Sequence, residues 1–328
     1  MSRHSDREED GRTVRYVLMI EAQQGLSYAD QLAIARRAEG AGFEAMFRSD
    51  HYESFPGPPG RRTTDAWTVL AGLARETERI RLGVLVSPVT FRLPGTLAKI
   101  VATVDEMSGG RIELGMGAGW NELEHRRHGV PFPPINERAD MLEEQLAIVH
   151  GLWDEPDGWS FAGAHYRIED AIFHPKPVQK PRPPFIVGGE GSPRSLRIAA
   201  RYADEFNVTS SDPARVAERY AMLDEACRAI GRDPVSIRRS AMVGTLIGRD
   251  QAELVRRKGA LLGEFTADEQ GEEWFATREG RWILGTPDQA RDRVAAFAAA
   301  GVQRLVLQDF LPRDLDMIDQ LGEELVRQ

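Results

Sequence analysis

Short apolar runs alternate with longer segments of helical periodicity along most of the chain. The first run, residues 14–21 (VRYVLMIE), is apolar on consecutive positions, as strands buried on both faces are. Residues 28–41 then place apolar side chains three and four apart, which predicts an amphipathic helix. Further strands are expected near 43–47, 80–87, 111–117, 184–189, 205–210, 240–247 and 305–308, and further helices near 65–77, 95–107, 137–153, 195–201, 213–230, 288–300 and at the C-terminus.

This regular alternation predicts a parallel sheet with right-handed crossovers. About eight such units favour a closed barrel over an open sheet, and 328 residues suffice for one barrel with insertions. Gly42, Gly109, Gly231 and Gly301 follow helical segments, where a left-handed residue commonly ends a helix. We therefore predict the α/β class, as a single (β/α)₈ TIM barrel over residues 13–328, with a disordered leader at 1–12.

Two segments interrupt the alternation. Residues 153–184 are rich in proline, glycine and aromatic residues, and residues 249–285 contain Phe265, Trp274 and Trp282. Barrel enzymes build their active sites on the loops that follow the strands, and long loops there usually carry function. We therefore expect both insertions to cover the C-terminal mouth of the barrel.

The charge composition limits the classes of binding partner that we expect. The chain has 42 lysines and arginines against 51 acidic residues, a formal net charge of −9. Non-specific binding to nucleic acid or to an anionic membrane needs clustered basic residues, so we expect neither partner. No apolar run approaches the roughly 20 residues of a membrane span, and the N-terminus lacks the apolar stretch of a signal peptide. We expect a cytoplasmic protein.

The first candidate site is SDHY, residues 49–52, directly after the second predicted strand. Asp50 and His51 would emerge at the catalytic rim, where a histidine titrating near neutrality beside a carboxylate suits acid/base chemistry. The alternative is that His51 only forms hydrogen bonds within the loop.

The second candidate is GMGAGWN, residues 115–121, after the fourth predicted strand. Its glycines allow a ligand to approach the backbone closely. Trp120 occupies the place of the third glycine of a dinucleotide fingerprint, so that fingerprint fails. Trp120 offers a flat face and Asn121 a pair of hydrogen-bonding groups. The alternative is a tight turn with Trp120 in the core.

The third candidate is VGGEGSPRS, residues 187–195, again a strand, glycines and a helix start. Ser192 is a plausible N-cap and Pro193 a good first helical residue. Free N–H groups at this helix start, with Arg194 beside them, would bind a phosphate. A simple strand-to-helix turn would have the same sequence.

Other residues favour structural roles. Cys227 is the single cysteine and lies in an apolar helical pattern, so we expect a core thiol. The segment EHRRH, residues 124–128, places two histidines three apart. It lacks a third ligand and is crowded by arginines, so we expect a solvated helix face and no metal site. Ser/His/Asp catalysis lacks its G-x-S-x-G elbow.

Together these segments resemble the luciferase-like monooxygenase superfamily, and within it the branch that depends on coenzyme F420, a deazaflavin. The resemblance runs from about residue 14 to residue 308 and implies a (β/α)₈ barrel with the flavin-like ring over the strand ends. Its most specific parts are AEGAGFEAMFRSDHY (38–52), SPVTFRLPGTLAKIVATVDEMSGGRIELGMGAGWNELEH (87–125) and PVQKPRPPFIVGGEGSPRSLRIAARYADEFN (177–207).

The resemblance implies roles for individual residues. His51 lies near the reactive carbon of the ring as acid/base, Asp50 contacts the ring, and Trp120 helps orient the substrate. Trp120 also stands where sugar-phosphate-oxidising relatives use a glutamate, so that substrate class is not expected. The remaining cofactor positions are Leu85 and Val86, where relatives often carry a non-prolyl cis peptide, Pro88 beside it, Ala118, Gly119 and Asn121 in the ring-holding turn, and Gly189, Gly191, Ser192 and Arg194 in the phosphate turn.

The predicted reaction is hydride transfer between coenzyme F420 and a small organic substrate, with a homodimer as the expected assembly. Two alternatives remain open: an FMN-dependent monooxygenase fed by a separate reductase, and a non-catalytic flavin- or deazaflavin-binding protein. Because the deazaflavin carries an acidic tail, a local basic patch is expected. Its candidates are Arg61 and Arg62 after the second strand and Lys176, Lys180 and Arg182 before the fifth.

Overall fold

The computed structural model describes residues 14–209, 211–265 and 268–327, so the predicted leader at 1–12 lies outside the described residues. Within these ranges eight parallel strands close into a barrel, because β8, at one end of the sheet order, also pairs with β9, beyond which only β10 extends. This confirms the (β/α)₈ prediction. The barrel strands are β1 (Arg15–Ile20), β2 (Ala45–Arg48), β3 (Arg81–Pro88), β4 (Ile112–Gly117), β7 (Phe185–Gly189), β8 (Glu205–Thr209), β9 (Arg238–Ile247) and β11 (Arg304–Asp309).

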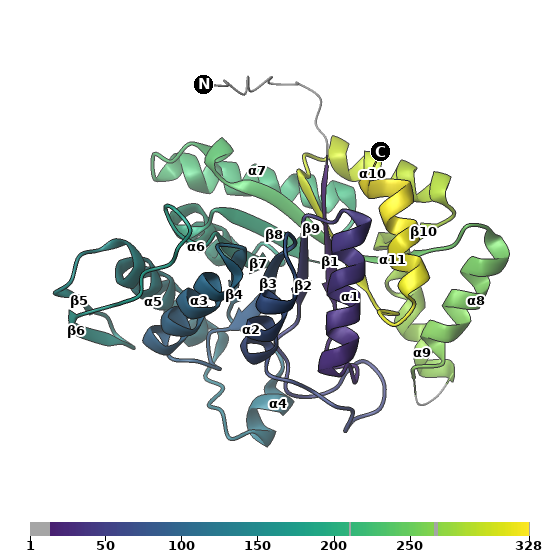
Figure 1. Ribbon diagram of the computed structural model, residues 1–328. Helices are drawn as coiled ribbons and strands as arrows, with labels where there is room; N and C mark the ends of the chain where they lie inside the picture. The colour runs from purple at the N-terminus through teal and green to yellow at the C-terminus, as the bar shows by residue number, and fades with distance from the viewer. Residues whose placement is uncertain (1–13, 210, 266–267, 328) are drawn as a thin grey trace, which may run out of the picture.

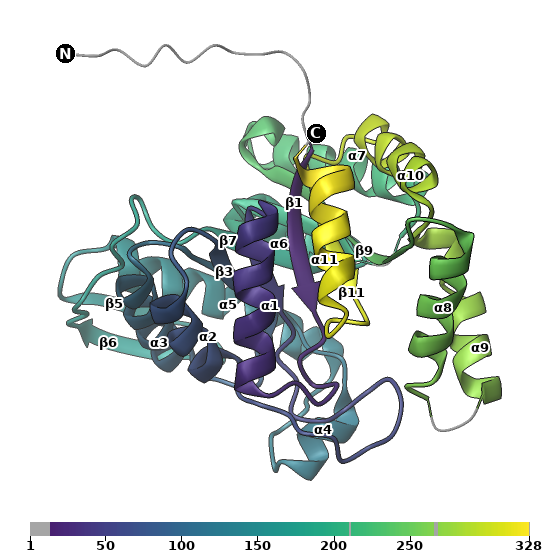
Figure 2. The same ribbon diagram turned by 45° about the vertical axis from the view of Figure 1, so that its right-hand side comes forward.

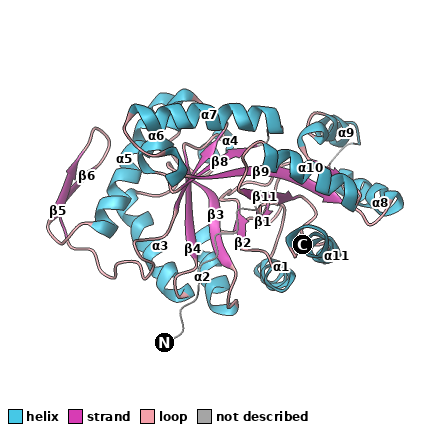
Figure 3. Cartoon of the chain, turned by 90° about the horizontal axis from the view of Figure 1, so that it is seen from above, coloured by secondary structure: helices cyan, strands magenta, loops and turns pink. Residues whose placement is uncertain are grey.

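Helices surround this barrel, as the view from above shows (Figure 3). The first of them begins with a capping box between Ser27 and Asp30 and ends at Gly42, whose φ of 92° is left-handed. Within the described ranges no helix is both long and apolar enough to cross a bilayer. The surrounding helices are α1 (Tyr28–Ala41), α2 (Ala66–Glu76), α3 (Pro94–Ser108), α5 (Ile135–Asp154), α6 (Pro193–Tyr202), α7 (Pro213–Ala229), α10 (Pro287–Ala299) and α11 (Leu315–Leu321), which continues into a π-helical turn at Gly322–Val326.

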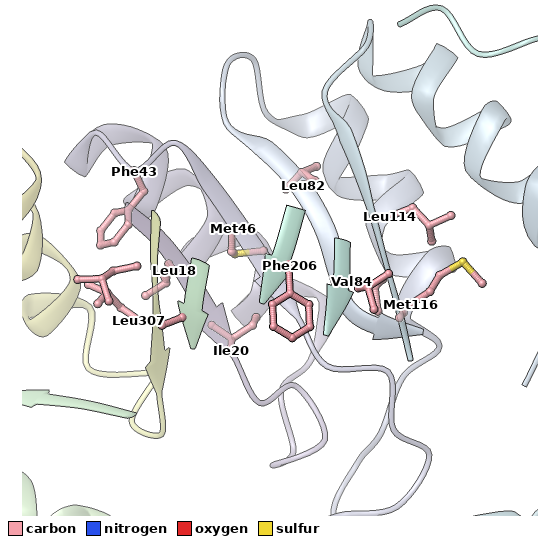
Figure 4. Packing of buried hydrophobic residues seen from close by; sticks show 14 of the residues in the cluster. Leu18, Ile20, Phe43, Met46, Leu82, Val84, Leu114, Met116, Phe206 and Leu307 are labelled. Carbon is pink, nitrogen blue, oxygen red and sulfur yellow. The ribbon is translucent and has the colours of Figure 1, made fainter. Parts of the chain in front are cut away.

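The core has two layers because successive strand residues point to opposite faces. In β1, Leu18 and Ile20 pack outward against the helices, in the large cluster of Figure 4. Val17 and Met19 point inward and form a smaller cluster inside the barrel with Phe47, Leu85 and Ile186, among others. The unbroken apolar runs of the sequence therefore serve both layers. Cys227 is fully buried, as predicted.

The amino end of the barrel is filled by charge. Arg304, at the start of β11, has a side chain with no exposed surface. Its guanidinium lies 2.6 Å from Glu113 of β4, 3.0 Å from Glu205 of β8 and 2.9 Å from Glu44. The same guanidinium lies 5.1 Å from the ring centroid of Phe47, at the base of the inner cluster. Arg304 thus contacts three carboxylates beneath the apolar interior, while Arg81 also pairs with Glu113, Arg238 with Glu205 and Arg15 with Glu44.

The insertion at 153–184 does not cover the mouth, which corrects our expectation. It follows α5 and precedes β7, so it returns to the amino end of a strand rather than leaving a carboxyl end. Its hairpin, β5 (Trp159–Ala162) and β6 (Arg167–Ala171), lies beside α5 on the outside of the molecule (Figures 1 and 3). The ring of Trp159 packs directly on Gly151 of α5. A Cβ at position 151 would lie 2.2 Å from this ring, so only glycine leaves room for it.

The second insertion does follow a strand. After β9 come α8 (Gln251–Leu262), α9 (Asp268–Ala276), a 3₁₀ turn at Glu279–Arg281 and β10 (Ile283–Gly285), which extends the sheet beside β9. Its aromatic side chains pack on one another, with Trp274 meeting Trp282 edge-on at 5.6 Å between centroids, and on Phe310, which follows β11 and stacks on Trp282 at 5.2 Å. Phe275, Trp282 and Phe310 belong to the main hydrophobic cluster, and the expected cover over the mouth stays a prediction.

Replacing Arg304 by methionine tests the charged base of the barrel. We expect the free energy of unfolding to fall by about 3–5 kcal/mol, because removing one partner leaves buried charges uncompensated. The matched control is Arg15→Met, since the Arg15 side chain is 59 % exposed in its pair with Glu44; its expected change is below about 1 kcal/mol. Denaturant titrations at neutral pH measure both, and equal changes would contradict the assignment.

The pH dependence of the free energy of unfolding tests the same charged cluster in a second way. Burial tends to raise the pKa of Glu113, but Arg304 and Arg81 outweigh it and lower that pKa from 4.5 to about 2. The stabilisation is therefore complete above the ordinary pKa and is lost as the pH falls towards 2. We expect the wild-type free energy of unfolding to fall through this window and Arg304→Met to show a weaker dependence.

Candidate active site

The carboxyl ends of the strands all point to the end of the molecule where α4 (Glu122–Arg127) lies, at the bottom of Figures 1 and 2. Asp50 follows β2 directly, and its carboxylate is fully buried. Arg92, from the loop after β3, contacts both oxygens of that carboxylate, at 2.5 and 3.3 Å. Ser87 donates a hydrogen bond to it at 3.3 Å.

Arg92 also joins the site to α2. Its second terminal nitrogen lies 2.5 Å from Asp65, which caps the start of α2. Burial alone would lower the pKa of Arg92, but the nearby Asp50, Tyr52 and Asp65 outweigh burial and raise this pKa above its ordinary value. The guanidinium therefore stays charged. One arginine therefore holds together the loops that follow β2 and β3.

His51 is held on one side and free on the other. Its Nδ1 lies 2.9 Å from Oε1 of Glu124 on α4, and the second oxygen of Glu124 accepts the Tyr52 backbone N–H at 3.0 Å. The imidazole meets Phe55 and Trp120 edge-on, at centroid distances of 4.5 and 5.8 Å. Among the described residues, Nε2 of His51 has no hydrogen-bond partner, and the side chain is 15 % exposed.

The segment 124–128 is not a solvated face throughout, and this part of the prediction is wrong. Glu124 and His125 are buried, whereas Arg126, Arg127 and His128 are exposed. Both ring nitrogens of His125 are engaged, one with the Thr90 hydroxyl and one with the Asn121 carbonyl oxygen, each at 2.6 Å. Because α4 has only six residues, its buried face consists of just Glu124 and His125.

The turn at 118–121 lies at the same rim. Arg138 of α5 donates from Nε to the Ala118 carbonyl at 3.0 Å, and Gly119 has a left-handed φ of 77°. Trp120 is 66 % exposed and meets Phe55 edge-on at 5.2 Å, so the alternative of a tryptophan in the core does not hold. Asn121 precedes the first residue of α4 and makes no side-chain capping bond.

An apolar floor lies inside the mouth. The Leu85–Val86 peptide is cis, as the resemblance implied, and the pairing of β3 with β4 is interrupted there. Leu85 and Val86 belong to the cluster inside the barrel. A Cβ at Gly117 or Gly188 would lie 2.7 or 2.9 Å from the methyl groups of Val86, so glycine on both neighbouring strands leaves room for this side chain. Pro88 is buried beside it.

The start of α6 carries the predicted phosphate turn. Ser192 is the N-cap and accepts the Ser195 N–H at 3.2 Å. A Cβ at Gly189 would meet nothing within 4 Å, so this backbone faces open space. Arg194 pairs with Asp140 of α5. Two arginines of α7, which sequence reasoning missed, approach the same turn: Arg215, 3.8 Å from Glu190, and Arg219, whose side chain packs on Gly191.

The expected basic patch is largely wrong. Lys176, Lys180 and Arg182 precede β7, so they lie at the amino end of the barrel, and Lys176 binds the carbonyls of Leu152 and Glu155 at the end of α5. Arg61 lies on the mouth side but pairs with Glu264 at 2.7 Å. Arg62 is exposed in the same loop.

These features fit a flavin-like cofactor. The Leu85–Val86 floor offers an apolar surface to a planar ring, and the open backbone at Gly189, with the N–H groups of α6, suits a phosphate. His51 lies at the same end of the barrel with one unbonded nitrogen.

The sequence profile described as luciferase-like monooxygenase matches residues 14–304, and the chain belongs to this family. It is similar to an F420-dependent glucose-6-phosphate dehydrogenase of Microbacterium testaceum, with 30 % identity over 308 residues that cover 88 % of this chain and 90 % of the relative. It is also similar to an FMNH(2)-dependent dimethylsulfone monooxygenase of Pseudomonas putida, with 28 % identity over 85 % of this chain and 82 % of the relative.

Among solved structures, the fold matches an F420-dependent secondary alcohol dehydrogenase in complex with an F420-acetone adduct. The TM-score is 0.81 at 20 % identity, covering 96 % of this chain and all of the other. The family and the fold predicted from the motifs are thus confirmed.

Arg92 offers a stability test of the site. Arg92→Met leaves the buried Asp50 carboxylate without its cation, so we expect the free energy of unfolding to fall by about 3–5 kcal/mol. Adding Asp50→Asn should recover part of that loss, since a neutral amide needs no counter-charge. A double-mutant cycle in denaturant measures the coupling. A double variant no more stable than Arg92→Met would contradict the pairing.

Proposed function

We propose that this protein is an F420-dependent oxidoreductase that transfers a hydride between the deazaflavin and a small organic alcohol or carbonyl compound. The observation that carries the proposal is His51, held at Nδ1 by Glu124 and unbonded at Nε2, at the same end of the barrel as the Leu85–Val86 floor. The F420-dependent relatives support the choice of cofactor. When bound, the deazaflavin supplies the hydride acceptor or donor.

The residues of the chain divide the remaining work. The cis Leu85–Val86 segment and Pro88 support the ring from below, and the turn at Ala118, Gly119 and Asn121 holds its edge. The start of α6, with Gly189, Gly191, Ser192 and Arg194, binds the phosphate. Asp50 is buried against Arg92, so its contact with the ring stays a prediction.

His51 moves the proton. For alcohol oxidation, Nε2 takes the hydroxyl proton, and for carbonyl reduction the imidazolium returns it. A positioned acid/base of this kind contributes about 10²–10⁴-fold to the rate. Trp120 and Phe55 flank the imidazole and restrict where a substrate carbon can lie. Because Trp120 offers an indole rather than a carboxylate, glucose 6-phosphate is not the proposed substrate. The homodimer, the separate reductase and the cytoplasmic location stay predictions.

His51→Asn tests the acid/base role. We expect kcat to fall by about 10²-fold or more, while the Kd of the deazaflavin stays within a few-fold. Steady-state kinetics with a panel of secondary alcohols and fluorescence titration of the cofactor measure the two quantities. Turnover equal to that of the wild type would remove His51 from the mechanism.

Cofactor choice is tested by titrating the deazaflavin and FMN in parallel at two salt concentrations. We expect tighter binding of the deazaflavin, weakened by salt, because its acidic tail would meet exposed cations such as Arg62 and Arg215. Turnover should continue without oxygen. Tighter FMN binding together with a requirement for oxygen would favour the monooxygenase, and tight cofactor binding with no turnover of any substrate would favour the non-catalytic protein.

A further inference from the structure

We propose that Glu124 is the positioning residue of His51: it fixes the imidazole in the tautomer protonated at Nδ1 and thereby makes Nε2 the proton-accepting atom. This rests on the proposed function, in which His51 is the acid/base. It assigns a role to a segment whose sequence pattern indicated only a solvated face.

The contact itself determines the tautomer. A carboxylate can only accept hydrogen bonds, so Nδ1, 2.9 Å from Oε1 of Glu124, must be the donor. The Glu124 side chain is 1 % exposed, so water does not compete for this bond. Among the described residues Nε2 has no partner, so in this tautomer its lone pair is left to accept a proton.

The second oxygen of Glu124 makes the arrangement rigid. It accepts the Tyr52 backbone N–H at 3.0 Å, so one carboxylate holds both the ring of His51 and the chain that follows it. A glutamine could not satisfy both donors with oxygen. With its oxygen on the Tyr52 N–H, its amide NH₂ would face Nδ1 and force the proton onto Nε2.

The other charged groups around His51 have partners of their own, so Glu124 is the carboxylate that interacts with the imidazole. In the loop after β2, Glu53 pairs with Arg127 and His128 of the α4 segment. On the other side, Asp50 pairs with Arg92. His125, on the same helix, is bonded to Thr90 and to a backbone carbonyl. When Nε2 takes a proton, the imidazolium therefore forms directly against one buried carboxylate, which stabilises it.

The first experiment reads the tautomer directly. Imidazole ¹⁵N spectra of the cofactor-free protein at neutral pH, assigned by the signals lost in His51→Asn, should show His51 protonated at Nδ1 and unprotonated at Nε2. Glu124→Gln should shift the population towards Nε2–H. A wild-type His51 protonated at Nε2 would overturn the proposal, even if the glutamine variant failed to fold.

The second experiment reads catalysis. We expect Glu124→Gln to lower kcat by about 10–100-fold, less than the loss of the acid/base itself, with KM and cofactor Kd within about twofold. The pH–rate profile of the variant should also differ from that of the wild type, since the negative charge beside the imidazole is gone. Glu122→Gln, on the exposed face of the same helix, is the matched control and should behave as the wild type.

A double variant separates the two proposals. If Glu124 acts only through His51, adding Glu124→Gln to His51→Asn causes no further loss of kcat. Full turnover in His51→Asn would overturn the proposed function. The positioning role alone would be overturned if His51→Asn lost most of its turnover while Glu124→Gln kept the kcat and the pH profile of the wild type. Fully multiplicative losses of kcat in the double variant would overturn it as well.

Discussion

A single guanidinium sets the base on which the barrel interior is built. Arg304 contacts three carboxylates at the amino ends of the strands, two of them almost fully buried, and ion pairs with Arg81, Arg238 and Arg15 complete their charge balance. Phe47 lies over Arg304 and begins the apolar layer that continues to Leu85 and Ile186. At the opposite end of the barrel, Asp50 and His51 follow the carboxyl end of β2.

Much of the fold was predictable because each apolar run serves two packing layers. In β1, Leu18 faces the helices and Val17 the barrel interior, so neither face is polar and the run is unmistakable. The side on which an insertion lies is a different kind of property. Composition marked residues 153–184 as irregular, but their position between a helix and a strand determines that they return to the amino end. Aromatic content alone pointed to the wrong end of the barrel.

The site was predictable where it depends on a single segment. The position of His51 after a strand and of Ser192 before a helix follows from local order in the sequence. The partners that hold these residues come from elsewhere: Arg92 reaches Asp50 from the next strand, and Glu124 reaches His51 across 73 positions. A six-residue helix is too short to show a period, so the burial of Glu124 left no signature. For Asp50 the sequence did offer a chemical signal, since a buried carboxylate requires a cation and Arg92 is such a residue.

The pair between Arg61 and Glu264 couples two parts of the chain that lie 203 positions apart in the sequence. Arg61 contacts both the Glu264 carboxylate, at 2.7 Å, and its backbone carbonyl, at 2.6 Å, so the loop that carries His51 is tethered to the segment between α8 and α9. The β5–β6 hairpin is linked to the mouth less directly, because Tyr166 shares the side-chain amide of Gln145 with the backbone carbonyls of Val89 and Arg92. A substitution in the segment between α8 and α9 that breaks the contact with Arg61 is therefore expected to alter the loop that carries His51.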